Sequence, residues 1–417
     1  MSNGHKPAAE ISEAVTRGQP KLAAVVLAFA MLTTYNGVIP IFATRICQYF
    51  SLSVEQYGTM IGLGSLSQMV SLVLVGLMIA RFGVRRIAQY SLVGIGACFM
   101  FIGLGASLSS LKYSIAIHGF FAGLFKVAMP AFLIALYPAL KRRMVSVQLV
   151  AFSAAGIVVP LWANQLLQGS EAGGDLAFAS VFFVPFLIVG CILIAGGVVL
   201  GLNRQPRLEG PQETTSGTRF VRELFKFRSL TIVALVALHA SADGTLFQFL
   251  PMFMEHHFDE LPLAPAWALS GHAIAYVTTR FLLSLLPEGV GQRAILTLAG
   301  PIGGLIILAM LWQRHAVSIP LLYTLASLFY AAEFPVLVSE ISSRSMGQFG
   351  TILAGGFLAA NAGTFAFMKG TGRLVDTTDD YRLSLSVAAC GFIAFGVIAA
   401  ATGLGKSLPS RKKMDPE

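Results

Sequence analysis

The sequence predicts an all-α membrane protein with twelve transmembrane helices in two pseudo-symmetric six-helix bundles, and three observations lead to this prediction. The 417 residues are 55% hydrophobic and 12% charged, with a mean hydropathy of +0.74, whereas roughly a quarter of the residues in soluble proteins are charged. The apolar residues gather in segments of about 20, the length of helix that crosses a bilayer. The two halves of the chain also resemble each other at a constant offset.

This composition argues against several classes of protein. A cytosolic enzyme and a nucleic-acid-binding protein would both carry more charge, and the net charge of +9 comes from basic residues in short loops between apolar segments. The four cysteines occur singly in or beside apolar segments, which argues against a secreted disulfide scaffold. We therefore expect no enzymatic activity, no cofactor, no metal ion and no nucleic-acid partner.

Each apolar segment has to form a helix, because lipid offers its backbone groups no other hydrogen-bonding partner. The first segment is too long for the apolar part of a cleavable signal, so it is kept as the first helix. The predicted spans are residues 22–44, 57–80, 87–107, 113–137, 146–168, 177–201, 229–253, 266–286, 294–312, 318–338, 350–370 and 384–405.

The positions of the basic residues predict how these spans are oriented. With both chain ends in the cytoplasm, 21 of the 29 lysines and arginines lie on the cytoplasmic side, 6 lie on the opposite side and 2 lie inside spans, which is the asymmetry that orients insertion. We expect a monomer in the plasma membrane, a bacterial inner membrane. The predicted organisation is a cytoplasmic tail (1–21), an N-terminal bundle (22–201), a polar cytoplasmic linker (202–228), a C-terminal bundle (229–405) and a second cytoplasmic tail (406–417).

An offset of 207 residues aligns the two halves of the chain. It superimposes three pairs of residues: Asn36 on Asp243, Lys126 on Glu333 and Arg86 on Arg293. Each pair falls on the helix or loop that a six-helix repeat requires. The coincidences therefore indicate duplicated halves rather than one irregular bundle.

The loop after the second span contains a motif, Gly76-Leu-Met-Ile-Ala-Arg81-Phe-Gly83-Val-Arg85-Arg86. It resembles the G-x-x-x-D-R-x-G-x-R-R signature of the major facilitator superfamily, with Ala80 where the family usually has Asp. The resemblance implies a secondary transporter in which two bundles rock about a central site and expose it alternately to the two sides of the membrane. It also implies that the motif residues form a gating loop; the alternative is that the basic residues only anchor the topology.

The resemblance further implies a central site lined by the first, fourth, seventh and tenth helices, where this sequence concentrates unusual polar residues. An ionisable residue at the bilayer centre costs at least about 2.5 to 3.5 kcal/mol on insertion scales, so it normally faces the protein interior and has a function. The candidates are Tyr35, Asn36, Lys126, His239, Asp243, Gln248, Tyr330 and Glu333.

Lys126 is expected to face the cavity, because it lies too deep in the fourth span to reach the headgroups easily. We expect it to bind substrate together with Tyr35, Asn36, Gln248 and Tyr330. The alternative is a locked ion pair with a carboxylate. The repeat offset favours Glu333 as that partner, because it predicts that Lys126 and Glu333 face each other across the cavity as a latch.

Asp243 and Glu333 are candidate proton carriers. Burial disfavours a charged carboxylate and a nearby ammonium favours it, so the protonation state of each can change as access alternates. His239 and Asp243 are four residues apart and share a helix face, which suits a proton relay or, less readily, two metal ligands. The alternatives are a polar cap for Asp243, a hydrogen-bonded pair with Tyr330 or Lys126 for Glu333, and a satisfied structural histidine for His239; His118 and His272 are also interpreted as structural.

Arg280 lies in the eighth span where many facilitators place an arginine, and in their oxalate and monocarboxylate branch that arginine faces an anionic substrate. The alternative is that Arg280 extends to the cytoplasmic surface. Drug and proton antiporters of the family usually carry G-x-x-x-G-P in the fifth helix. Here Val159 precedes Pro160 and the upstream small residue is Ala155, so this branch is disfavoured.

The function predicted from the sequence is proton-coupled secondary transport of a small polar solute, an organic anion or a neutral metabolite, by alternating access. The expected partners are the lipid bilayer, the small-molecule substrate and protons. Two alternatives remain: an exporter of amphipathic compounds or drugs with the same fold, and a membrane receptor or scaffold that transports nothing. A nucleotide-binding loop is missing from the sequence, so ATP is not the expected energy source.

Overall fold

The computed structural model describes residues 19–136, 141–170, 174–202, 226–258, 263–286, 291–344 and 349–404. All regular structure in these residues is helical; η1 is a 3-10 helix and η4 a π-helix. The elements are α2 (Gln19–Leu32), η1 (Thr33–Val38), α3 (Ala43–Tyr49), α4 (Val54–Phe82), α5 (Val84–Gly105), α6 (Leu108–Leu136), α7 (Lys141–Ser170), α8 (Gly174–Leu202), α10 (Phe227–His257), α11 (Ala264–Leu285), α12 (Gln292–Ala294), η4 (Ile295–Ala299), α13 (Gly300–Leu311), α14 (Ser318–Tyr330), α15 (Glu333–Arg344), α16 (Phe349–Thr378) and α17 (Tyr381–Thr402).

Every predicted span coincides with a helix or with a broken helix. In the described part of the chain, ten helices are long and apolar enough to cross a membrane, and one bent pair in the first span adds an eleventh. The eighth predicted span is filled by α11, which is less apolar than these ten. The protein is therefore an all-α integral membrane protein. Most of the predicted linker and both predicted tails lie outside the described residues.

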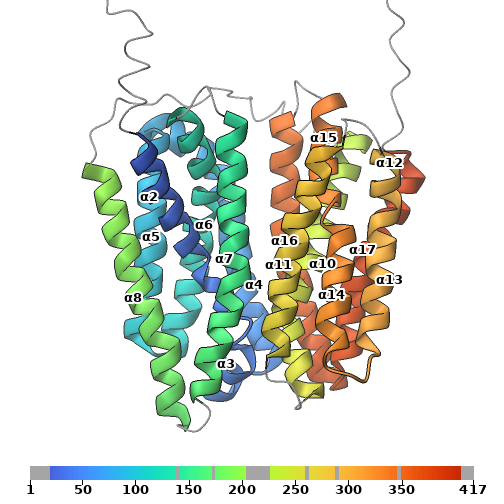
Figure 1. Cartoon of the computed structure of the whole chain (residues 1–417), viewed down its shortest axis with the longest axis horizontal. Coiled ribbons are helices and arrows are strands. Elements are labelled where there is room, and N and C mark those ends of the chain that lie inside the picture. Colours follow the sequence, from blue (N-terminus) through green and yellow to red (C-terminus); the bar gives the residue numbers. More distant parts are fainter. Residues whose placement is uncertain are drawn as a thin grey trace, which may run out of the picture.

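The helices form two groups that follow the halves of the chain (Figure 1). We call α2 to α8 the N-bundle and α10 to α17 the C-bundle. The face at which α2 begins and α17 ends is the terminal face, and the opposite face is the distal face. Successive helices run in alternate directions, so that α4 begins at the distal face and α16 ends there.

Two of the predicted spans are interrupted where a proline removes a backbone donor. The first span changes from α2 to η1 and then bends by 57° before α3, because Pro40 cannot donate to the carbonyl of Asn36. The tenth span breaks between α14 and α15, since Pro335 cannot donate to the carbonyl of Ala331. These interruptions place irregular backbone at the depth of the protein centre, where a membrane protein tolerates it only inside the fold.

The two bundles meet closely where α4 packs against α16. A methyl group placed on Gly58 would lie 2.5 Å from the carbonyl oxygen of Met368, and one on Gly372 would lie 2.5 Å from that of Val54. Gly62 approaches Phe365 in the same way. Small residues are needed here because lipid supplies no hydrophobic force between helices, and close backbone packing has to hold the interface. The contact extends from the distal face toward the centre of the protein.

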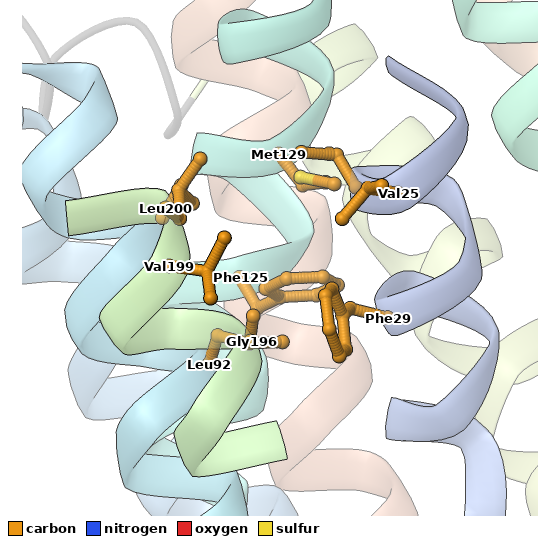
Figure 2. A pocket seen from close by; sticks show the side chains of 10 residues that line it. Val25, Phe29, Leu92, Phe125, Met129, Gly196, Val199 and Leu200 are labelled. Atoms are coloured by element: carbon orange, nitrogen blue, oxygen red, sulfur yellow. The ribbon is translucent and has the colours of Figure 1, made fainter. Parts of the chain in front are cut away.

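The N-bundle contains a small apolar cavity of about 10 Å³ between α2, α5, α6 and α8 (Figure 2). Figure 2 shows Phe29, Leu92, Phe125 and Met129 around it, with Gly196 on α8. A cavity of this size that offers no polar partner does not hold water well. It is a packing gap rather than a candidate binding site.

Candidate functional site

A cavity of about 520 Å³ occupies the centre of the N-bundle and extends to the C-bundle at Gln248. This volume is typical of small-molecule sites. It is bounded by residues of η1, α4, α5, α6, α7 and α10. The lining residues are Thr33, Thr34, Asn36, Ile39, Ile61, Gly64, Ser65, Gln68, Ile95, Phe99, Ile102, Ile115, His118, Gly119, Ala122, Phe125, Lys126, Pro130, Gln148, Phe152 and Gln248.

One face of α6 forms a wall of this cavity. His118, Ala122, Lys126 and Pro130 follow one another at intervals of four residues, the spacing that keeps side chains on one side of a helix. Lys126 is an exposed residue although it lies well inside α6, because it opens onto the cavity. The structure therefore places Lys126 on the cavity face, as the sequence predicts.

The predicted pairing of Lys126 with Glu333 is wrong in this structure. Glu333 is fully buried inside the C-bundle and is bonded to His239. Among the described residues, no ion pair joins Lys126 to Glu333 or to Asp243. The reason is the break before α15, which changes the direction in which the tenth span presents Glu333, whereas α6 continues unbroken through Lys126.

Two buried polar atoms at the cavity have no hydrogen-bond partner among the residues that the structure describes. Nε2 of His118 and Oε1 of Gln148 are both buried and unpartnered. The His118 ring stacks on Phe99, with ring centroids 5.3 Å apart and an angle of 15° between the planes. Gln248 instead donates to the hydroxyl of Tyr57 across the bundle boundary. Unsatisfied buried groups are unusual in proteins, so His118 and Gln148 are candidates for contact with a ligand.

A second polar cluster lies inside the C-bundle, and most of its side chains are buried. His239 of α10 and Glu333 of α15 are joined by a 2.7 Å contact from Nδ1 to Oε2, and Glu333 is 0% exposed. Gly300 of α13 makes room for this pair, because a methyl group there would lie 2.3 Å from Oε1 of Glu333. The pair can hold a proton on either residue, since imidazole and carboxylate share it over one hydrogen bond.

Asp243 and His272 form the more accessible part of the same cluster. Oδ1 of Asp243 lies 3.7 Å from Nε2 of His272, and the Asp243 side chain is 23% exposed. On its other nitrogen, His272 contacts the hydroxyl groups of Ser327 at 3.0 Å and of Tyr330 at 3.2 Å. The hydroxyls of Ser327 and Tyr330 are themselves 2.8 Å apart. The interpretation of His272 as a merely structural histidine overlooked this placement beside a carboxylate.

Arg280 belongs to this cluster as well. Its guanidinium lies 5.2 Å from the centre of the Tyr276 ring, which suits a cation–π contact, and the centre of that ring lies 4.5 Å from the centre of the His272 ring. His272, Tyr276 and Arg280 succeed one another every four residues and so share one face of α11. That spacing is the sequence signal that could have identified His272.

The predicted substrate-binding residues are divided between the two regions. Asn36, Lys126 and Gln248 line the cavity, whereas Tyr330 and Arg280 lie in the cluster of the C-bundle. Tyr35 is only 4% exposed and packs against aromatic rings of Phe99, Trp162 and Phe186, because η1 turns it away from the cavity. The cavity residues that the sequence reasoning did not select as binding residues include Gln68, His118 and Gln148.

The predicted gating loop connects α4 to α5. Gly83 has a φ of +86°, a conformation that favours glycine, and links the two helices. Arg85 donates hydrogen bonds to the carbonyl oxygens of Leu200 at 3.0 Å and of Gly201 at 2.8 Å, at the end of α8. Arg81 lies 5.5 Å from the ring centre of Phe82, while Gly76 and Arg86 are exposed. Arg85 thus caps a helix C-terminus, which is favourable for a cation.

At the distal face a carboxylate joins the two bundles. Asp376 of α16 accepts hydrogen bonds from the backbone nitrogens of Val54 at 2.9 Å and Glu55 at 2.8 Å. These are unsatisfied donors of the first turn of α4, which also carries the positive end of the helix dipole. Ser270 of α11 adds a 2.8 Å hydrogen bond to the carbonyl of Ile157 on α7.

Two helical bundles joined at one face, with a cavity between membrane-spanning helices that is lined by apolar and polar side chains, are the architecture of a secondary transporter rather than an enzyme. The family model of the Major Facilitator Superfamily matches residues 23–354. The chain belongs to this superfamily, and it is an integral membrane transporter.

Solved structures of transporters with the same fold are similar over nearly the whole chain. A bacterial homologue of the human lysosomal transporter Spinster, in an inward-facing and occupied conformation, has a TM-score of 0.72 at 15% identity, with 95% of this chain and 96% of that chain covered. FucP in the outward conformation has a TM-score of 0.63 at 15% identity, with 92% and 98% covered. A second structure of FucP, described as the fucose:proton symporter of E. coli, has a TM-score of 0.63 at 14% identity and the same coverage. A search of curated proteins found no match.

Proposed function

We propose that this transporter moves a small organic anion, or a neutral metabolite, together with protons by alternating access. The observation that carries the proposal is the separation of two regions: a cavity with an accessible cation, Lys126, and a largely buried cluster of acids and histidines in the C-bundle. A solute can bind in the first while a proton binds in the second. Proton symport by FucP, a transporter of similar fold, agrees with this proposal.

The C-bundle cluster suits proton coupling because it contains both an accessible and an inaccessible site. Asp243 is partly exposed, so it can exchange a proton with water in the open state. His239 lies one turn away on the same helix and is bonded to Glu333, which is fully buried. A proton can therefore pass from Asp243 through His239 to Glu333, away from solvent.

The bundle contacts support an inward-open state. The positive-inside asymmetry predicts that the terminal face is cytoplasmic, and the bundles join toward the distal face through Asp376, Gly58 and Gly372. Opening to the other side then requires Asp376 to release the start of α4, so these hydrogen bonds act as an outer gate.

The experiment that tests proton coupling uses purified protein in proteoliposomes that contain a pH-sensitive dye. A panel of organic acids and neutral metabolites is first screened for thermal stabilisation of the protein across pH. A stabilising solute should then be accumulated when a proton gradient is imposed, and dye fluorescence should report proton movement with it. Accumulation that persists with a protonophore would contradict proton coupling and leave sodium coupling or facilitated diffusion.

A second candidate function is export of amphipathic compounds. The apolar side chains in the cavity lining, among them Ile61, Phe99 and Ile115, favour it. Export predicts that the solute leaves the side of the terminal face in exchange for protons, so solute and protons move in opposite directions. The same liposomes distinguish the two, because symport acidifies the compartment that the solute enters.

A further inference from the structure

One charged side chain lines the central cavity among the residues that the structure describes. Lys126 is the only Lys, Arg, Asp or Glu among its lining residues, and among the described residues no carboxylate forms an ion pair with it. A lysine inside the membrane normally has a partner, because an isolated charge there is costly. The cavity therefore favours one anionic group from solution and opposes a cation.

Polar side chains that line the cavity together with Lys126 can donate hydrogen bonds to the oxygen atoms of such an anion. Gln148 of α7 is 4% exposed, and its side-chain oxygen has no hydrogen-bond partner among the described residues. Turning this amide by 180° presents its NH2 group as a donor to an anion. Gln68 of α4 also lines the cavity. His118, on the same face of α6 as Lys126, has an unpartnered ring nitrogen.

Apolar side chains gather at the distal end of the cavity, where Gln248, in the last third of α10, is already bonded to the Tyr57 hydroxyl. Ile61 lies in the first third of α4, Phe99 and Ile102 in the last third of α5, and Ile115 in the first third of α6, all of which are the distal portions of these helices. Lys126 lies beyond the middle of α6, toward the terminal face. A ligand that fills the cavity thus has its charged group toward the terminal face and its hydrocarbon part toward the distal end.

We propose that the substrate is an amphipathic monoanion, with one carboxylate held by Lys126 and a compact apolar body seated between Phe99, Ile102 and Ile115. The inference rests on the proposed transport function for its physiological meaning and narrows the substrate to a class. A charge-assisted hydrogen bond fixes the carboxylate, while burial of the hydrocarbon supplies affinity.

The first test compares matched probes on the purified wild-type protein by isothermal titration. The probes are phenylacetate, phenethyl alcohol and phenethylamine, which share the aromatic body and differ in the polar group, and lactate, which has the carboxylate without the aromatic body. We expect phenylacetate to bind about tenfold or more tightly than phenethyl alcohol or lactate, and phenethylamine not to bind. Equal affinities of the acid and the alcohol, or no binding of phenylacetate, overturn the proposal.

The second test uses one variant directed at the carboxylate of the ligand and one directed at its apolar body. Lys126→Gln should weaken phenylacetate binding about tenfold or more and leave phenethyl alcohol unchanged, whereas Ile115→Thr should weaken phenylacetate and leave lactate unchanged. Lys112→Gln is the matched control, since Lys112 lies on the same helix but not in the cavity lining. If Lys126→Gln does not fold, the comparison of the four probes on the wild-type protein still tests the proposed substrate class.

Binding and flux measurements distinguish an error in the substrate class from an error in the proposed proton coupling. Proton-driven flux of an uncharged solute, with phenylacetate binding that does not need Lys126, would overturn the substrate class and leave proton coupling standing. Phenylacetate binding that depends on Lys126, without any proton-linked flux, supports the substrate class and contradicts the coupling.

Discussion

The N-bundle and the C-bundle differ in the surroundings that they give to their charged residues inside the membrane. Lys126 in the N-bundle is accessible from a cavity that has no acidic side chain among its described lining residues, whereas Glu333 in the C-bundle is fully buried and bonded to His239. The sequence repeat superimposes these two residues, so related positions have acquired different surroundings. A charged side chain that lines a cavity is available to a ligand. A charged side chain that is buried and already paired can exchange only a proton. This contrast supports a mechanism in which the N-bundle binds the solute and the C-bundle carries the proton.

The largest effect is expected from removing the cavity charge. Lys126→Ala should reduce transport more than tenfold, because no other lining residue can replace its charge. Uptake into proteoliposomes measures the effect, with Lys112→Ala as the control. Transport within twofold of wild type would show that the cavity does not use its cation.

Neutralising the acids of the C-bundle should separate coupling from binding. Asp243→Asn and Glu333→Gln should abolish accumulation driven by a proton gradient yet retain counterflow exchange, since the solute site in the N-bundle is untouched. Both activities are measured in the same liposome preparation. If both variants still concentrate solute, the acids do not carry the proton.

The His239–Glu333 pair should also contribute to the free energy of unfolding. Glu333→Ala leaves His239 buried without its partner, at a cost of about 1 to 3 kcal/mol for an unsatisfied buried group. Combining it with His239→Phe should recover part of that loss, because neither polar group then remains. Thermal unfolding in detergent measures the cycle. Strictly additive losses would mean that the two side chains do not act as a pair.

A smaller effect is expected at the contact between the bundles. Asp376→Ala removes two hydrogen bonds between the bundles at the first turn of α4 and leaves the Ser53 N-cap in place, so it should favour opening at the distal face by about 1 to 2 kcal/mol. The distance distribution between spin labels on the distal ends of α4 and α16 should shift to longer values. Asp379→Asn is a suitable control, because Asp379 has a positive φ that asparagine tolerates and makes no contact with α4 among the hydrogen bonds of the described residues.

The smallest effect is expected at the loop after α4. Its hydrogen bonds, from Arg85 to the end of α8, stay within the N-bundle. Arg85→Ala should lower stability by about 1 kcal/mol, since the end of α8 loses its cap. Arg86→Ala, at an exposed neighbour, should change stability little. Equal melting temperatures of the two variants would show that the hydrogen bonds to α8 contribute nothing measurable.

The sequence by itself determined the membrane class, the places of the spans and the family. These properties depend on the length and hydropathy of segments and on one local motif, which tertiary packing does not alter. The sequence also placed Lys126 on a cavity face, because an intramembrane lysine has few tolerable positions.

Only the tertiary structure decided which polar residues meet. Sequence offset paired Lys126 with Glu333, but a proline-induced break turned Glu333 toward His239, and η1 turned Tyr35 into an aromatic core. His272 came next to Asp243 because α10 and α11 pack together. The direction of a side chain depends on helix rotation, on breaks and on the neighbouring helix, and none of these is encoded in the spacing of residues along a single span.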